Sequence, residues 1–102
     1  MEKKSPKVRH LRYEALRRSL TETIESWPTV YEHKIIGKNG EAFAGSLKDF
    51  ENRFPRLNRK HSHTSKNGKY LSMTYELMAR DVDEIILLWV ESENLKDFVT
   101  VL

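Results

Sequence analysis

The segment Gly37-Lys38-Asn39-Gly40 places two glycines and a lysine immediately before an expected helix. Free backbone N–H groups at the first turn of a helix attract anions, and glycines let a ligand approach the main chain closely. We therefore take these four residues as candidates for binding a small anionic metabolite such as a carboxylate. The alternative is an ordinary connection between a strand and a helix, which needs no ligand.

A second candidate surface lies in the basic part of the chain. Residues 53–69 hold six lysines and arginines and no acid, whereas residues 76–97 hold seven acids. Basic strands with exposed aromatic side chains bind RNA or DNA through phosphate contacts and base stacking. Against this function, Glu76 would share the face of Tyr70, and a net charge of +3 is small enough for the two regions to compensate each other. The candidate residues for this alternative are Arg56, Arg59, Lys60, Lys66, Lys69 and Tyr70.

The residue types give less support to metal binding or catalysis. His61 and His63 would share one face of a strand and His33 adds a third imidazole, but no carboxylate lies near them in the sequence. Ser72 and Thr74 lie in a strand without the glycine elbow that exposes a nucleophile. We expect a protein without catalysis, metal or cofactor.

The spacing of apolar residues predicts the elements that position these candidates. Spacing by two predicts strands at residues 30–36 and 71–77, and spacing by three or four predicts helices at 43–54 and 80–95, the second capped by Asp81. Residues 57–65 form a polar strand, Asn67-Gly68 predicts a type I′ hairpin turn, and residues 96–102 form the last strand. This order predicts an α+β, ferredoxin-like βαββαβ fold, a four-stranded antiparallel sheet with two helices on one face.

An extra amphipathic helix is expected at the start of the chain, over residues 8–27. Its apolar or amphipathic residues recur every three or four positions among charged neighbours: Tyr13, Leu16, Leu20, Ile24 and Trp27. We divide the chain into this basic extension, residues 1–26, and a domain of residues 27–102. An apolar helix face and an open sheet face both require cover, which a homodimer or a protein partner would supply.

The start of the chain is charged and lacks the apolar stretch of a signal peptide, and no apolar run approaches the ~20 residues that span a bilayer. Cysteine is absent, which excludes disulfide scaffolds and thiolate metal sites. These features predict a cytoplasmic protein with no membrane association.

Three short motifs stand out along the chain: "WPTVYEHKIIG" at residues 27–37, "SKNGKYLSMT" at residues 65–74, and the last helix followed by "VTVL". They resemble, in this order, the opening, the hairpin and the ending of the YbeD-like family of small bacterial proteins of unknown function. Some members are labelled lipoate regulatory proteins, and no reaction is known for the family. The N-terminal helix is an addition to the family's pattern, and the first sheet-covering helix is shorter.

The resemblance covers about three quarters of the chain, residues 27–102, and implies a ferredoxin-like fold related to ACT domains. ACT domains bind small metabolites between paired subunits. The resemblance therefore implies a non-catalytic regulatory or binding protein that takes a small anionic metabolite or a protein partner in an ACT-like manner. Binding of RNA or DNA by the basic strand and hairpin is the alternative function.

Overall fold

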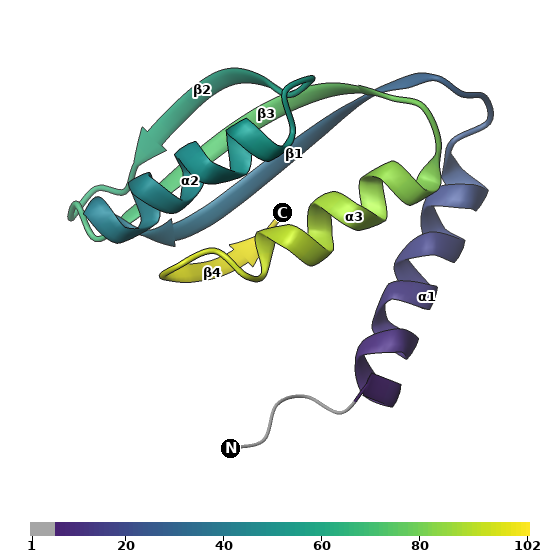
Figure 1. Cartoon of the computed structure of the whole chain (residues 1–102), viewed down its shortest axis with the longest axis horizontal. Helices are drawn as coiled ribbons and strands as arrows, with labels where there is room; N and C mark the ends of the chain where they lie inside the picture. Colours follow the sequence, from purple (N-terminus) through teal and green to yellow (C-terminus); the bar gives the residue numbers. More distant parts are fainter. Residues whose placement is uncertain (1–5) are drawn as a thin grey trace.

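The computed structural model describes residues 6–102, with side chains from Arg12 onward. Figure 1 shows a sheet with two helices laid across one face and a third helix beyond them. In chain order the elements are α1 (Pro6–Thr23), β1 (Thr29–Lys38), α2 (Glu41–Arg53), β2 (Asn58–Thr64), β3 (Tyr70–Ala79), α3 (Val82–Ser92) and β4 (Phe98–Val101).

The four strands form one antiparallel sheet in the order β2-β3-β1-β4. Strand order and helix placement confirm the expected ferredoxin-like α+β fold with an added N-terminal helix. The strand residues under α2 and α3 are buried, as Ile35 of β1 and Tyr75 of β3 illustrate at 0% exposed. Among the helices that the structure describes, none covers the opposite face of the sheet (Figure 1).

Helix α2 packs on the sheet through the expected apolar stripe. Phe43, Leu47 and Phe50 are buried, and Phe54, the residue after the helix, is half-buried beside Phe50 with ring centroids 5.0 Å apart. Pro55 follows, and a proline disfavours helical geometry in the residue before it. The helix therefore stops at Arg53.

The start of helix α3 confirms the predicted cap. The side chain of Asp81 accepts a hydrogen bond from the backbone N–H of Glu84 at 3.0 Å, which satisfies one of the free donors of the first turn. The helix ends at Ser92, three residues before the expected end at 95.

The hairpin between β2 and β3 lies where Asn67-Gly68 predicted it, but its turn type is different. Gly68 has φ of 78°, whereas Asn67 does not have a positive φ, so this is not a type I′ turn. The Gly68 N–H donates to the Ser65 carbonyl at 2.8 Å and the Ser65 N–H to the Tyr70 carbonyl at 2.8 Å. The Asn67 side chain accepts from the Lys69 N–H at 3.0 Å, a local bond that stabilises the loop of residues 65–69 in this other conformation.

Helix α1 packs against α3 on the side away from α2 (Figure 1). Arg17 pairs with Asp83 at 2.5 Å, and Arg12 pairs with Glu93. Leu20, Ile24 and Trp27 pack against the domain's own core. Much of the stripe that we expected a partner to cover is thus covered within the chain.

The expected extension of residues 1–26 contains this helix, which stops at Thr23, before the expected end at Trp27. β-branched residues such as Thr21, Thr23 and Ile24 lose side-chain freedom in a helix, which is consistent with the earlier end. Residues 1–5 lie outside the described part of the chain. Among the described helices, none is long and apolar enough to span a membrane.

Candidate functional site

A hollow of about 370 Å³ lies on the open face of the sheet, next to the β2–β3 hairpin. We call it the hairpin hollow. Its polar side chains are two lysines, one histidine, one tyrosine and two serines, and none of its lining residues is an acid. Tyr70, 42% exposed, contributes an aromatic ring. The lining residues are Lys34, Ile36, His63, Ser65, Lys66, Tyr70 and Ser72.

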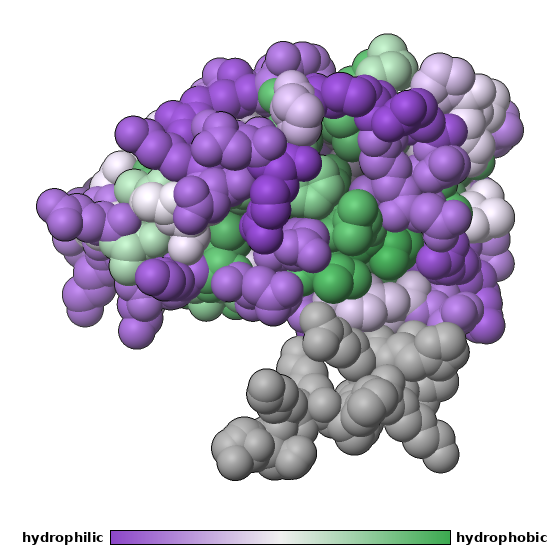
Figure 2. All heavy atoms as spheres, in the orientation of Figure 1, coloured by the Kyte–Doolittle hydropathy of each residue, from purple (hydrophilic) through white to green (hydrophobic). Residues whose placement is uncertain are grey.

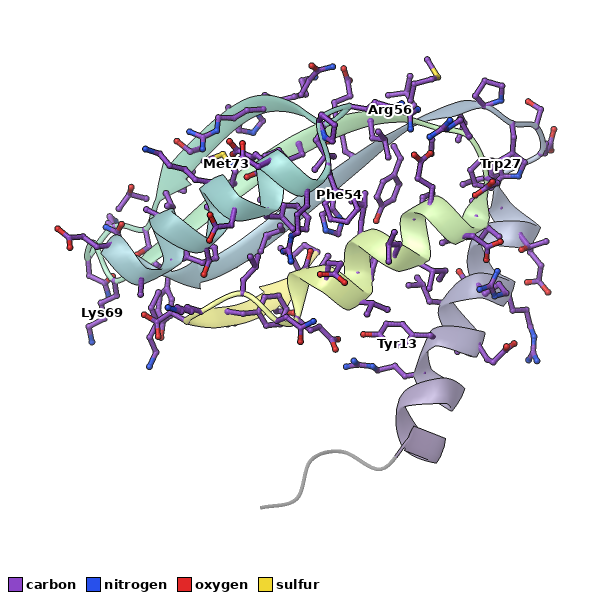
Figure 3. The ribbon with its side chains drawn as sticks, viewed as in Figure 1. Tyr13, Trp27, Phe54, Arg56, Lys69 and Met73 are labelled. Atoms are coloured by element: carbon purple, nitrogen blue, oxygen red, sulfur yellow. The ribbon has the colours of Figure 1, made fainter. Side chains whose placement is uncertain are left out.

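The predicted ligand loop, Gly37 to Gly40, is only partly a loop: Gly37 and Lys38 are the last residues of β1, which extends past its expected end at 36, and Asn39 and Gly40 connect it to α2. The Asn39 N–H donates to the Lys69 carbonyl at 2.9 Å, and the Asn39 side chain donates to the Gly68 carbonyl at 3.1 Å. Lys38 is paired with Tyr70 across β1 and β3, so its side chain belongs to the open face with Lys34 and Ile36. The structure therefore brings the predicted anion-binding residues and the hairpin residues of the nucleic-acid hypothesis together at one end of the sheet. Figure 3 shows Lys69 at this end.

The main chain of that loop has internal roles. The Lys38 N–H donates to the Asp97 carbonyl at 2.9 Å, and the Asn39 N–H is used as described above. A Cβ atom on Gly37 would lie 2.5 Å from the Phe43 ring, so this glycine is required by packing. Gly40 precedes α2 without a side-chain cap. The N–H groups of Lys38 and Asn39 are therefore used within the chain, while the Lys38 side chain is exposed.

The middle of the open face carries more negative than positive charge, because two acids lie around one lysine. Glu32 and Glu76 lie opposite each other across β1 and β3, and the Lys60 ammonium lies 3.6 Å from Glu32 and 3.5 Å from Glu76. The excess of positive charge on this face is therefore confined to the hairpin end.

The six residues of the nucleic-acid hypothesis do not form one surface. A register shift between Arg59 and His61 changes which side of the sheet the β2 side chains face. Arg59 pairs with Glu51 of α2 at 2.7 Å, and Arg56 pairs with Glu84 of α3, both on the helix side. Lys60 lies between its two acids on the open face. Lys66 and Tyr70 line the hairpin hollow, and Lys69 lies at the same end (Figure 3).

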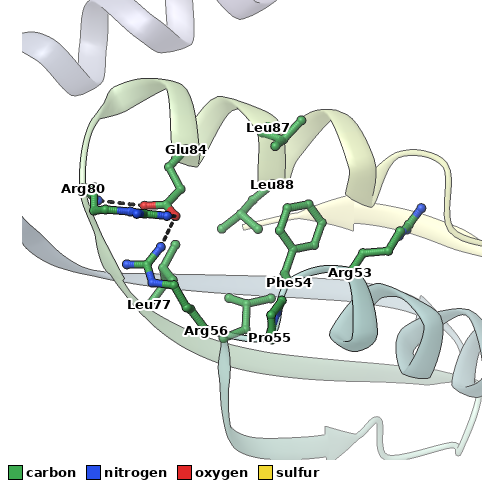
Figure 4. Close-up of a pocket in the computed structure, with 10 residues that line it drawn as sticks. Arg53, Phe54, Pro55, Arg56, Leu77, Arg80, Glu84, Leu87 and Leu88 are labelled. Carbon is green, nitrogen blue, oxygen red and sulfur yellow. Dashed lines mark hydrogen bonds and ion pairs between the residues drawn. The ribbon is translucent and has the colours of Figure 1, made fainter.

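A second cavity, of about 330 Å³, lies on the helix side between the end of α2 and the first turns of α3 (Figure 4). We call it the α2–α3 groove. Six of its lining residues are apolar: Phe54, Pro55, Leu57, Leu77, Leu87 and Leu88. The other four are charged: Arg53, Arg56, Arg80 and Glu84. Figure 2 shows hydrophobic surface over this part of the molecule, bordered by hydrophilic side chains.

Glu84 organises the charged side of the groove. Its carboxylate accepts from the Arg80 N–H at 2.8 Å, from the Arg56 guanidinium, and from the Arg80 guanidinium at 3.5 Å. Burial by itself would raise the pKa of Glu84, but the Arg80 N–H and the two guanidiniums outweigh it and hold that pKa below its ordinary value. Arg56 also donates to the Met78 carbonyl. Arg56 and Glu84 are therefore held against each other on this side of the groove.

A chain of polar side chains, partly buried at Tyr31 and Trp89 and buried at His33 and Ser92, connects β1 to α3. The Trp89 Nε1–H donates to the Tyr31 hydroxyl at 2.7 Å, and that hydroxyl lies 3.5 Å from His33 Nδ1. His33 Nε2 lies 2.8 Å from the Ser92 hydroxyl, which donates to the Leu88 carbonyl at 2.7 Å. Because Ser92 uses its proton on Leu88, it accepts from Nε2–H, and Nδ1 is left to accept from Tyr31. A neutral imidazole therefore satisfies every partner in this chain.

His33 is 0% exposed, and burial lowers its pKa to about 4. It faces rings of Phe50 and Trp89 rather than acids. His61 and His63 lie apart from it on the exposed β2 strand. Across the part of the chain that the structure describes, no group of three or more histidine, aspartate or glutamate side chains is arranged to hold a metal ion.

Comparison with known proteins assigns the chain to a protein family. The family model described as "Protein of unknown function (DUF493)" matches residues 22–100. The chain belongs to the DUF493 family. Both cavities lie within the DUF493 region, and most of α1 precedes it. A search of curated proteins found no match.

The fold of this DUF493 protein is similar to the solution structure of protein HP0495 from H. pylori. The TM-score is 0.60 and the sequence identity 19%, over 81% of this chain and 92% of that chain. At this identity the similarity concerns the fold.

Several residues of the DUF493 chain line one of the two cavities although the sequence did not predict them as binding residues. Lys34, His63 and Ser65 line the hairpin hollow, and Arg80 and Glu84 line the α2–α3 groove. The alternation of β1 placed Lys34 on the open face, and extending that pattern to the hairpin would have found the hollow. Nothing in the sequence signals the groove, because its walls are about 30 residues apart along the chain.

Proposed function

We propose that this protein is a non-catalytic binding domain that takes a small anionic metabolite at the hairpin hollow. The observation that carries the proposal is a hollow with cationic and hydroxyl side chains and no acid in its lining. Lys34 and Lys66 would neutralise the anion, and Tyr70 and Ile36 would contact an apolar or planar part of the ligand. Lys38 would add charge at the rim.

Charge distribution favours a small anion over an extended nucleic acid. A strand of RNA or DNA that crossed the open face would pass Glu32 and Glu76, whose charges repel phosphate and exceed that of Lys60 between them. A compact anion contacts the hairpin end alone. The ligand class is therefore a phosphate or carboxylate compound that fits a volume of about 370 Å³.

The hydroxyl groups of the hollow support binding without catalysis. The Ser65 hydroxyl donates to the Asn67 side chain at 2.9 Å and accepts from the Tyr70 N–H at 3.0 Å. The Ser72 hydroxyl donates to the His63 carbonyl at 3.4 Å. A serine nucleophile needs a base that accepts its proton, and these two hydroxyls donate elsewhere.

RNA or single-stranded DNA remains a second candidate because of one observation. Tyr70 is 42% exposed beside Lys66, and an exposed ring next to a cation can stack a base at the end of a strand. Such binding would weaken steeply with salt, because cations on the protein displace the counterions of the phosphates.

We also propose that the protein is a cytoplasmic regulator that self-associates in an ACT-like manner, as the resemblance to YbeD-like proteins implies. Val30 and Met78 pair across β1 and β3 on the open face and are 55% and 50% exposed. Two copies packed through this face would cover them. Native mass spectrometry measures the oligomeric state directly, and a monomer at high concentration would remove this part of the proposal.

The test is an NMR titration of ¹⁵N-labelled protein with inorganic phosphate, pyrophosphate, citrate, adenosine monophosphate and a ten-residue oligouridine. We expect at least one small anion to shift the amide signals of Lys34, His63, Lys66 and Tyr70 in a saturable way. Lys66→Ala and Lys34→Ala should weaken that binding, and Lys48→Ala on the exposed side of α2 is the matched control. No saturable shift with any small anion would refute the proposal, and saturation by oligouridine alone would favour the second candidate.

A further inference from the structure

We propose that the α2–α3 groove is the docking site for a peptide segment of a partner protein that combines apolar side chains with an acidic one. The apolar side chains would enter the groove, and the carboxylate would pair with Arg80. The groove lies on the helix side of the sheet and the hairpin hollow on the open face, so this site is separate from the proposed anion site.

The floor of the groove is apolar and rigid. Leu77 and Leu88, 3% and 0% exposed, belong to the core, so their positions are fixed by packing on β3 and α3. Leu87 stands at the rim and is 48% exposed, although its helix neighbours Ile86 and Leu88 are buried. Figure 4 shows Leu88 of α3 and Phe54 at the end of α2 facing each other, and Leu87 also lines the groove. A partner's apolar side chain would remove this surface from water.

The charged side of the groove has a cation with unused capacity. Arg56 is occupied by Glu84 and by the Met78 carbonyl, and Arg53 pairs with Glu91 at 3.1 Å. Arg80 has one long side-chain contact, 3.5 Å to Glu84, and 69% of its side chain is exposed. A guanidinium has five N–H donors arranged to bind a carboxylate with two parallel hydrogen bonds. The lining holds three arginines and one acid, so an incoming carboxylate is complementary in charge.

The size and shape of the groove favour a peptide. Its volume of about 330 Å³ is at the lower end of the range of about 300 to 1,000 Å³ for small-ligand pockets, and it is open along the rim at Leu87. A peptide that inserts side chains while its backbone stays outside fits such a site, as in helix-in-groove recognition. Nucleic acid would leave the apolar floor uncovered.

A random library of 12-residue peptides displayed on phage tests the proposal without a known partner. The library is selected on the folded wild-type protein and then measured against two variants, Leu87→Lys and Arg80→Glu. Both residues are exposed, so the fold should survive, which circular dichroism and the thermal midpoint check. The matched controls are Val99→Lys, also an exposed apolar residue, and Lys96→Glu, another exposed cation, both outside the groove.

We expect enriched peptides that combine leucine-like residues with aspartate or glutamate. Arg80→Glu and Leu87→Lys should each weaken their binding by about tenfold or more, while the controls bind like the wild type. The proposal is overturned if no peptide is enriched, if the enriched peptides lack acids, or if binding is unchanged in the groove variants. A wild-type dimer that Leu87→Lys dissociates, with no enriched peptide, would assign the groove to a second copy and overturn it as well. Phosphate titration of the same variants should be unchanged, so failure here is distinct from failure at the hairpin hollow.

Discussion

Acid should destabilise this protein through His33 in a way that one substitution can isolate. The imidazole is buried, is hydrogen-bonded as a neutral ring between Tyr31 and Ser92, and has no acid against it. Its pKa is about 4 in the folded protein against 6.5 in an unfolded chain. Between those two pH values the unfolded chain binds the proton and the folded protein does not, so the free energy of unfolding must decrease as the pH falls.

The size of the effect follows from those two values. Each pH unit between them is worth about 1.4 kcal/mol, so the contribution of His33 is complete above pH 6.5 and about 3 kcal/mol smaller near pH 4. That loss is a large part of the roughly 5 to 15 kcal/mol that stabilises a typical domain.

The assay is urea denaturation at several pH values from 7.5 to 4, followed by tryptophan fluorescence, in the wild type and in His33→Gln. Glutamine keeps a donor for Ser92 and an acceptor for Tyr31 but does not titrate in this range. We expect His33→Gln to be less stable at pH 7.5 and to lose less stability on acidification, since other groups such as Glu84 titrate in both proteins. Identical pH dependence in the two proteins would refute the reasoning, as would an NMR titration of folded His33 with a midpoint near 6.5.

Two pairs of substitutions test the packing of Gly37 against Phe43 and the capping of α3 by Asp81. Gly37→Ala should cost about 1 to 3 kcal/mol by urea denaturation because its Cβ would lie 2.5 Å from the Phe43 ring, whereas Gly45→Ala, with open space at its Cβ, should be neutral or stabilising. Equal stability of the two variants would show that Phe43 moves without cost. Asp81→Ala should lose about 1 kcal/mol with the cap of α3, and Asp81→Ser should retain most of it. Equal loss in Ala and Ser would contradict the capping role.

The order of strands and helices was predictable because apolar residues recur at a regular spacing in most of these elements. The alternation in β3 placed Met73 and Tyr75 inside and Tyr70 outside, and the stripe of α2 placed Phe43 and Phe50 inside. Asp81 gave a cap signal that the structure confirms. These signals are local, so a single sequence contains them.

The composition of the candidate sites depends on long-range contacts that a single sequence does not contain. Lys38 and Tyr70 meet because of the β1–β3 register, and Arg56 and Glu84 meet because α3 folds back beside the end of α2. The register shift in β2 separates Arg59 from the open face, although the sequence places it in one basic run with Lys60. The turn type was missed because the Asn67 side chain bonds to the backbone of its own loop.

Strand β2 forms one edge of the sheet, and all seven of its residues are exposed. An exposed edge offers free backbone groups to another molecule, which is how sheets join into aggregates. Here the register shift interrupts the edge, and Arg59 and Lys60 would bring like charges together if two copies met along β2. We therefore expect the two cations to hinder edge-to-edge aggregation, and replacing both with threonine should lower the concentration at which the protein begins to precipitate.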